Sequence, residues 1–143
     1  MGEKARLPVG CENVRPALEG HLDVLKWARK HGCPWELSQY GGVCENAAMC
    51  GHLEVLKWAR EHGCEWYFLG TCINAAKCGN LEVLKWAREN SDGWKHGVED
   101  AVRGWAAHHV HMAQGEFAHF RSSSNTDAYT DILRWLDEYV GNP

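Results

Sequence analysis

The sequence predicts an all-α protein, a short solenoid of stacked helix–turn–helix repeats. A sixteen-residue segment occurs three times, at 20–35, at 51–66 and, less closely, at 79–94. Trp27 and Trp58, which are equivalent, lie 31 residues apart, and the third copy follows after 28. A unit repeated at such intervals is one supersecondary element that buries its apolar face by stacking on its own copies. Stacks of this kind offer extended binding surfaces.

Each copy contains one amphipathic helix, which we expect over roughly 53–62 in the central copy. Leu53, Leu56 and Ala59 recur there at helical spacing, and further apolar residues widen the stripe to about half of the helix circumference. Such a helix needs neighbours on two sides. We therefore expect Trp58 to be buried against both neighbouring units.

A shorter apolar segment precedes each of these helices, CENAAMCG at 44–51 and CINAAKCG at 72–79. Its Ala-Ala pair allows close approach of a second, antiparallel helix, and its final glycine can turn the chain back. Gly63 stands where the longer helix should end with a left-handed residue. In the third copy no glycine stands there, so Asn90 must supply that cap or the helix frays.

Residues 47–56, Ala-Ala-Met-Cys-Gly-His-Leu-Glu-Val-Leu, followed by Gly63, resemble the core of the ankyrin repeat. The resemblance covers about 11–94 and is closest to variant repeats that end in Gly-Cys-Pro-Trp. The spacing of 28 is shorter than the usual period of roughly 33, and the shortening lies in the connector. The resemblance implies stacked helix pairs whose partners dock on the concave side, which is lined by first helices and connectors.

The chain of 143 residues then forms one ankyrin-like domain of four units. Residues 1–35 are expected to be an N-terminal capping repeat, 36–66 and 67–94 two further repeats, and 95–143 a degenerate C-terminal repeat.

The last of these units should open with a helix at 97–113 that places Val98, Ala101, Val102 and Trp105 on one side. His109 is a further candidate for that side. A polar inserted loop is expected at about 114–126. The second helix carries Trp135 in the place of Trp86, and removing Trp135 from this terminal copy should cost less stability than removing Trp58.

Charge and hydropathy exclude several functional classes. The 15 basic and 19 acidic residues give a net charge of −4, without a basic cluster or an acidic tail. The apolar runs are too short to span a bilayer, and residues 1–10 lack a hydrophobic signal core. We therefore expect a monomeric cytoplasmic protein that does not bind a membrane, and the bulk charge does not indicate a nucleic-acid partner.

The seven cysteines follow the repeat spacing, and we expect them to be reduced, small core residues. Cys50 with His52, and His62 with Cys64, resemble pairs of metal ligands. However, equivalent residues on stacked helices lie about 8–10 Å apart, whereas zinc needs four ligands at about 2.0–2.3 Å. We expect no metal among them.

A histidine-rich segment in the last unit is a second metal or general-base candidate, formed by His108, His109, His111 and His119 with Glu116. Glu-x-x-His occurs there once, and a dinuclear carboxylate site needs two copies. No metalloprotease motif, phosphate loop or nucleophile with a placed base is found. The sequence therefore predicts no enzyme, cofactor, catalytic residue or metal site.

The leading hypothesis is a protein-interaction module that binds a protein partner on its concave surface. The expected contact residues come from first helices and connectors, and the aromatic ones are typical interface anchors: Tyr40, Glu45, Asn46, Met49, Tyr67, Phe68, Ile73, Asn74 and Lys77.

The alternative is anion or nucleic-acid binding along a basic stripe of the outer helices. It is formed by the recurring Lys-Trp-Ala-Arg and one later arginine: Lys26, Arg29, Lys57, Arg60, Lys85, Arg88 and Arg134. Acidic residues interleave with it, which favours an ordinary solvated face.

Overall fold

The computed structural model describes residues 19–33, 35, 42–114 and 124–140. Every regular element in these ranges is a helix, which confirms the all-α class; the helices are α2 (Leu22–Lys30), α3 (Val43–Cys50), α4 (Leu53–Glu61), α5 (Phe68–Lys77), α6 (Leu81–Glu89), α7 (His96–Gln114) and α8 (Ser124–Val140). None of the described helices is both long enough and apolar enough to cross a bilayer. Tyr40 and the segment 115–123 lie outside the described residues.

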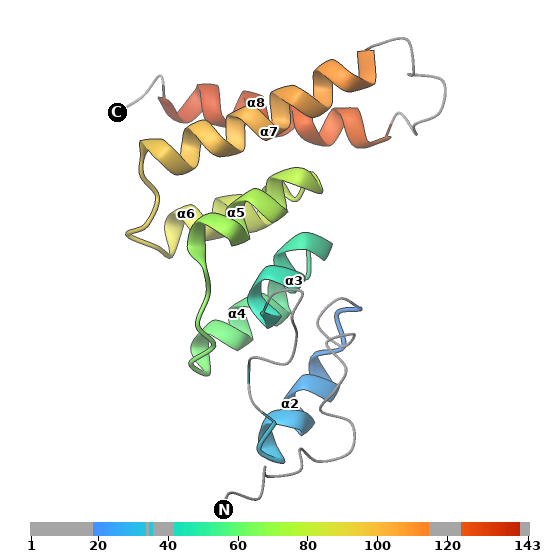
Figure 1. Cartoon of the computed structure of the whole chain (residues 1–143), viewed down its shortest axis with the longest axis vertical. Coiled ribbons are helices and arrows are strands. Elements are labelled where there is room, and N and C mark those ends of the chain that lie inside the picture. Colours follow the sequence, from blue (N-terminus) through green and yellow to red (C-terminus); the bar gives the residue numbers. More distant parts are fainter. Residues whose placement is uncertain (1–18, 34, 36–41, 115–123, 141–143) are drawn as a thin grey trace, which may run out of the picture.

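The helices form pairs that lie one above the other (Figure 1). Helix α3 pairs with α4, α5 with α6, and α7 with α8, and α5 packs between α3 and α7. The first helix of each pair therefore contacts the first helix of the next, and together these helices form one side of the stack.

The helix boundaries agree with most of the predicted ones. The helix expected over 53–62 is α4, and the one expected over 97–113 is α7. The loop predicted to reach residue 126 ends earlier, because α8 already begins at Ser124. At the position where the inner units have the left-handed Gly51 and Gly79, the last unit has Ala128, so the helix runs on without a break.

The core contains the same positions from successive units. Leu56 and Leu84 are fully buried, as are the Ala-Ala pairs of α3 and α5 that bring the helices close. In α7 the buried residues are Val98, Val102 and Ala106, whereas Trp105 is 37% exposed. The expectation that Trp105 faces the core is therefore wrong, because the inward stripe repeats every four residues from Val98.

The tryptophans join one unit to the next through a repeated contact. Trp27, Trp58 and Trp86 lie in helices, and a second tryptophan follows each of them eight residues later. The ring of this second tryptophan packs edge to face on the helix tryptophan of the next unit. The ring centroids are 5.6 Å apart for Trp35–Trp58, 5.7 Å for Trp66–Trp86 and 5.6 Å for Trp94–Trp135. Such pairs add about 0.5–1.5 kcal/mol beyond their area. The third contact places α8 where α4 and α6 stand in their units.

A backward hydrogen bond crosses two of the same junctions. Asn80 Nδ2 donates to Ala48 O at 2.7 Å and to Met49 O at 2.9 Å, and so caps the end of α3 from the next unit. Tyr129 holds the equivalent position of the last unit, and its hydroxyl donates to Lys77 O at 2.7 Å. Two different residue types thus satisfy helix-end carbonyls that lack partners within their own helix.

The prediction that Trp58 is buried fails, and of the two alternatives for the end of α6 the left-handed Asn90 is not observed. Trp58 is half-buried although Trp35 and His62 contact its ring, whereas Trp135, which contacts Trp94 and Tyr139, is only 5% exposed. Asn90 has φ −110° and is not left-handed. Instead its Nδ2 donates to Trp86 O at 2.9 Å, within its own turn.

The cysteines fit the predicted role only in part. Cys44, Cys64 and Cys72 are free and buried, as expected for small core residues. Cys50 and Cys78 are free but exposed. Cys33 is disulfide-bonded, so the prediction of a reduced thiol is wrong for this residue.

Candidate binding face

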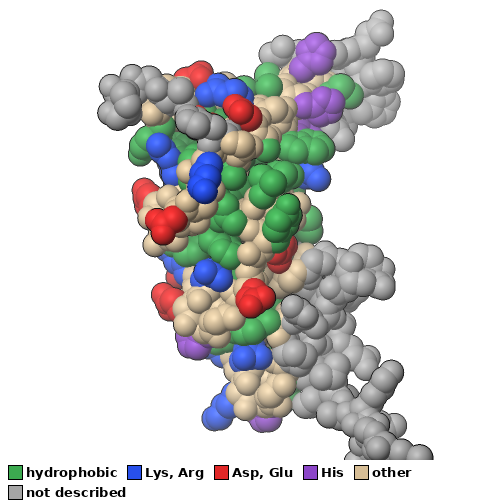
Figure 2. Space-filling model, turned by 60° about the vertical axis from the view of Figure 1, so that its left-hand side comes forward, with side chains coloured by type: hydrophobic (Ala, Val, Ile, Leu, Met, Phe, Trp, Pro, Cys, Tyr) green, Lys and Arg blue, Asp and Glu red, His purple; other side chains and the backbone are tan. Residues whose placement is uncertain are grey.

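The outward sides of α3, α5 and α7 form one continuous face, which we call the first-helix face. We define it by the exposed Met49, Tyr67, Lys77 and Trp105. Figure 2 shows hydrophobic side chains gathered on this side of the molecule, directly below the histidines of α7. Ile73 and Asn74 are half-buried on the same side of α5, opposite the buried Thr71, Cys72, Ala75 and Ala76.

Tyr67 is the most exposed large side chain of this face, at 67%. Its backbone N–H, just before α5, donates to Glu45 Oε1 at 2.8 Å, which ties it to α3. Its ring lies against Gly70, where a Cβ would come within 2.5 Å of the ring carbon Cδ1. Any larger residue at position 70 would therefore displace the ring. Tyr67 therefore has a side chain that is open to solvent and a backbone that is tied to α3.

A cation and an aromatic ring bridge α5 and α7 on the same face. Lys77 Nζ lies 4.4 Å from the centroid of the Trp105 ring. Beside Trp105, a shallow hollow of about 390 Å³ is lined by Ala101, Gly104 and His108. The lysine therefore lies over the aromatic surface, an arrangement worth about 0.5–1 kcal/mol at exposed sites.

Three residues expected to contact a partner have other positions or partners. Asn46 is only 5% exposed and has a polar partner of its own, so it belongs to the core. Phe68 packs edge to face on Trp66, with centroids 5.1 Å apart, and contacts Trp94 at 6.4 Å. Glu45 accepts the Tyr67 amide, so it positions Tyr67.

Trp105 is the residue of this face that the repeat pattern assigned wrongly. The last unit departs too far from the others for its first helix to be aligned residue by residue. The pairing of Lys77 with Trp105 joins two units, and no spacing within one unit reveals it.

The basic stripe is largely engaged within the protein. Lys57 pairs with Glu54 at 3.2 Å and Lys85 with Glu82 at 3.3 Å, one turn earlier in their helices. Arg134 pairs with Asp131 at 3.1 Å.

The arginines of the stripe turn inward. Arg29 and Arg60 donate to the carbonyl groups of Cys33 and Cys64, at 2.5 and 2.6 Å, and their guanidinium groups lie over the rings of Trp35 and Trp66. Arg88 lies 4.1 Å from the centroid of the Tyr139 ring. The arginines therefore strengthen the turns and junctions that join the units.

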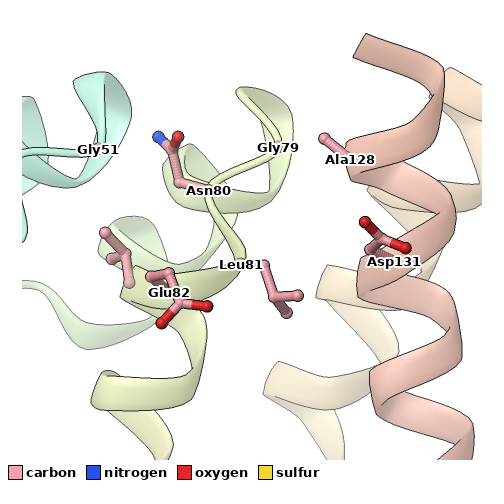
Figure 3. Close-up of a pocket in the computed structure, with 8 residues that line it drawn as sticks. Gly51, Gly79, Asn80, Leu81, Glu82, Ala128 and Asp131 are labelled. Atoms are coloured by element: carbon pink, nitrogen blue, oxygen red, sulfur yellow. The ribbon is translucent and has the colours of Figure 1, made fainter. Parts of the chain in front are cut away.

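A second hollow, of about 380 Å³, lies at the start of α6 beside α8 (Figure 3). Asn80, Glu82 and Asp131 supply its polar side chains. Each of them already has a partner within the protein, in the α3 carbonyls, Lys85 and Arg134 respectively. The hollow is a seam between units whose polar groups are satisfied.

No group of three or more histidine, cysteine or acidic side chains that could hold a metal ion occurs in the described ranges. His109 stacks on Tyr129, with centroids 4.7 Å apart and ring planes at 12°. His119 and Glu116 lie outside these ranges.

Comparison of the chain with family models, with curated proteins and with solved structures found no match.

Proposed function

We propose that this chain is an ankyrin-like repeat module that binds a protein partner on its first-helix face and carries out no catalysis. The proposal takes the helix pairs as the units of a solenoid of four repeats. The observation that carries it is Tyr67, which is two-thirds exposed yet held by Glu45 and Gly70. A residue whose backbone is fixed before binding loses less conformational entropy on binding, and exposed aromatic rings are the usual anchors of protein interfaces.

The composition of the face also favours a protein over an anion. Met49, Tyr67 and Trp105 are apolar or amphipathic, and Lys77 lies over an aromatic ring. Interface cores are enriched in aromatic residues and methionine and poor in free charges. The cations of the basic stripe are mostly in ion pairs, in hydrogen bonds or over aromatic rings, so few remain to attract phosphate.

The test is affinity capture of the partner with the full chain, followed by binding measurements on purified components. Tyr67→Ala should weaken binding at least tenfold, about 1.4 kcal/mol, and change the melting temperature by no more than about two degrees. Tyr139→Ala removes a tyrosine that is 48% exposed but lies on α8, outside the face, and it should bind normally.

A salt titration of the same complex separates the two classes of partner. Phosphate contacts weaken steeply as salt rises, whereas an interface anchored by aromatic residues changes little. If the affinity falls steeply with salt and Tyr67→Ala binds normally, the partner binds the basic stripe and not the first-helix face. Lys57→Ala and Lys85→Ala would then weaken binding instead.

A further inference from the structure

Two buried thiols of the central unit lie against each other. Cys44 is in the first turn of α3, and Cys64 is in the connector that follows α4. Their sulfur atoms are 3.2 Å apart, both side chains are at most 1% exposed, and both cysteines are free. The two sulfurs are therefore already in direct contact in the folded protein.

The two thiols are not electrostatically equivalent. The Cys44 S–H donates to Cys64 Sγ, which raises the pKa of Cys44 and lowers the pKa of Cys64. Burial raises the pKa of both, and the nearby Arg60 guanidinium acts in the opposite direction. Cys64 is therefore the better nucleophile of the pair, because the thiolate is the reactive form.

The neighbouring units provide two internal comparisons. Cys33 stands six residues after Trp27, just as Cys64 stands six after Trp58, and Cys33 is disulfide-bonded. In the third unit Asp92 stands at this position, so Cys72, the equivalent of Cys44, has no such neighbour. The central unit retains both thiols, adjacent and unlinked.

From this geometry we infer that Cys44 and Cys64 are a site of oxidative cross-linking, at which hydrogen peroxide or a related hydroperoxide converts the thiol pair to a disulfide. The inference is independent of the proposed binding function. It concerns how the central unit is held together, and it requires no partner.

The reaction balances with peroxide as the two-electron oxidant. The Cys64 thiolate attacks one peroxide oxygen, the O–O bond breaks, and the departing hydroxide takes up the thiol proton to form water. The Cys44 sulfur then attacks the Cys64 sulfenic acid, the S–S bond forms, and the S–O bond breaks. The Cys44 proton leaves with that oxygen as a second water.

The cross-link would fasten the start of α3 to the connector that leads to Tyr67. Cys64 lies in the connector after α4, where its N–H donates to Ala59 O and its carbonyl accepts from Arg60, so a small oxidant reaches the buried pair when this connector opens locally. A disulfide closing a loop of about 20 residues stabilises mainly by restricting the unfolded chain, and a rise in melting temperature of about 10 °C is expected.

The test treats the reduced full chain with hydrogen peroxide in a Cys33→Ser, Cys50→Ser, Cys78→Ser background, which removes the exposed thiols and the disulfide of Cys33. Peptide mapping should find the peptides of Cys44 and Cys64 joined with a loss of two hydrogens, and the melting temperature should rise and fall back on reduction. Cys44→Ser and Cys64→Ser should each abolish the rise. Separate sulfinic acids at the two residues, or a link from either to Cys72, would overturn the inference.

A variant that gains a cross-link provides a test that does not depend on the folding of the serine variants. Asp92→Cys places a thiol at the third unit's equivalent of Cys64, so peroxide should then also link position 92 to Cys72. If Cys44 and Cys64 still form a disulfide but positions 72 and 92 do not, the geometry shared by the repeats does not determine where the cross-link forms.

Discussion

Replacing Trp135 by alanine should destabilise the fold more than replacing Trp58, although Trp58 is central in the stack and Trp135 terminal. Trp135 is 5% exposed, with Trp94 and Tyr139 against its ring, and complete truncation of a buried tryptophan costs about 3–5 kcal/mol. Its Nε1 has no hydrogen-bond partner among the described residues, so burying this group destabilises the folded state. Removing it offsets part of the stability lost with the ring. We expect about 3 kcal/mol for Trp135→Ala and roughly half of that for the half-buried Trp58.

The assay is equilibrium unfolding in urea followed by far-ultraviolet circular dichroism, because tryptophan fluorescence changes with the substitutions themselves. Equal m-values are needed for the comparison of midpoints. Trp135→Phe serves as the control: it keeps an aromatic ring, deletes the unpaired N–H, and should cost less than about 1.5 kcal/mol. If Trp58→Ala costs as much as Trp135→Ala, burial of the ring does not set the stability of these junctions.

Three further outcomes can be measured in the same way. Asn80→Ala should lower the free energy of unfolding by about 1–3 kcal/mol, because two carbonyl groups of α3 lose their donor. Asn90→Ala should lower it less, because the lost hydrogen bond is exposed and lies within one helical turn. Arg60→Ala should cost about 1–2 kcal/mol through its lost carbonyl bond and ring contact, and Lys57→Ala should stay within about 0.5 kcal/mol. Burial raises the pKa of Cys72 to about 12, so the folded state keeps a proton that the unfolded state releases near pH 9. The free energy of unfolding should therefore fall as the pH rises from 9 to 12. In Cys72→Ala this fall should be smaller.

Repetition predicts local structure well in this chain, because each copy carries the same helix periodicity and the same terminal glycine. Gly51 and Gly79 have φ of 75° and 74°, as a left-handed helix end requires. The boundaries of α4 follow from the same pattern, and those of α7 follow from the apolar periodicity of that segment alone. The start of α8 does not, because Ala128 permits the helix to extend where a glycine would have ended it.

Burial is harder to predict from repetition, because equivalent positions do not have equivalent neighbours. Four residues after Trp135 stands Tyr139, and four residues after Trp58 stands His62; both rings contact their tryptophan, yet Trp135 is buried and Trp58 only half-buried. Asn46 was assigned to the binding face although it is shared between two copies, and it lies in the core. A polar residue shared between copies can thus belong to the core as readily as to a recognition surface.

The candidate face was predicted only in part for the same reason. Met49, Tyr67 and Lys77 are exposed, as recognition residues must be. Trp105 was missed because its place depends on how α7 packs on α5, which no alignment of the three clear copies contains. Tyr40 lies outside the described residues, and its assignment stays a prediction.

The junction between units has a consequence for how such a chain can change by recombination. Each inner unit supplies a tryptophan to the unit that follows, and Asn80 and Tyr129 reach back to the unit that precedes. Loss of residues 67–94 as one block would leave Trp66 beside Trp135 and the Tyr129 hydroxyl beside the Met49 carbonyl. Duplication of the same block would repeat both contacts. The gene for this protein can therefore lengthen or shorten by whole units, whereas an insertion or deletion that is not a whole unit moves the two halves of a contact out of register.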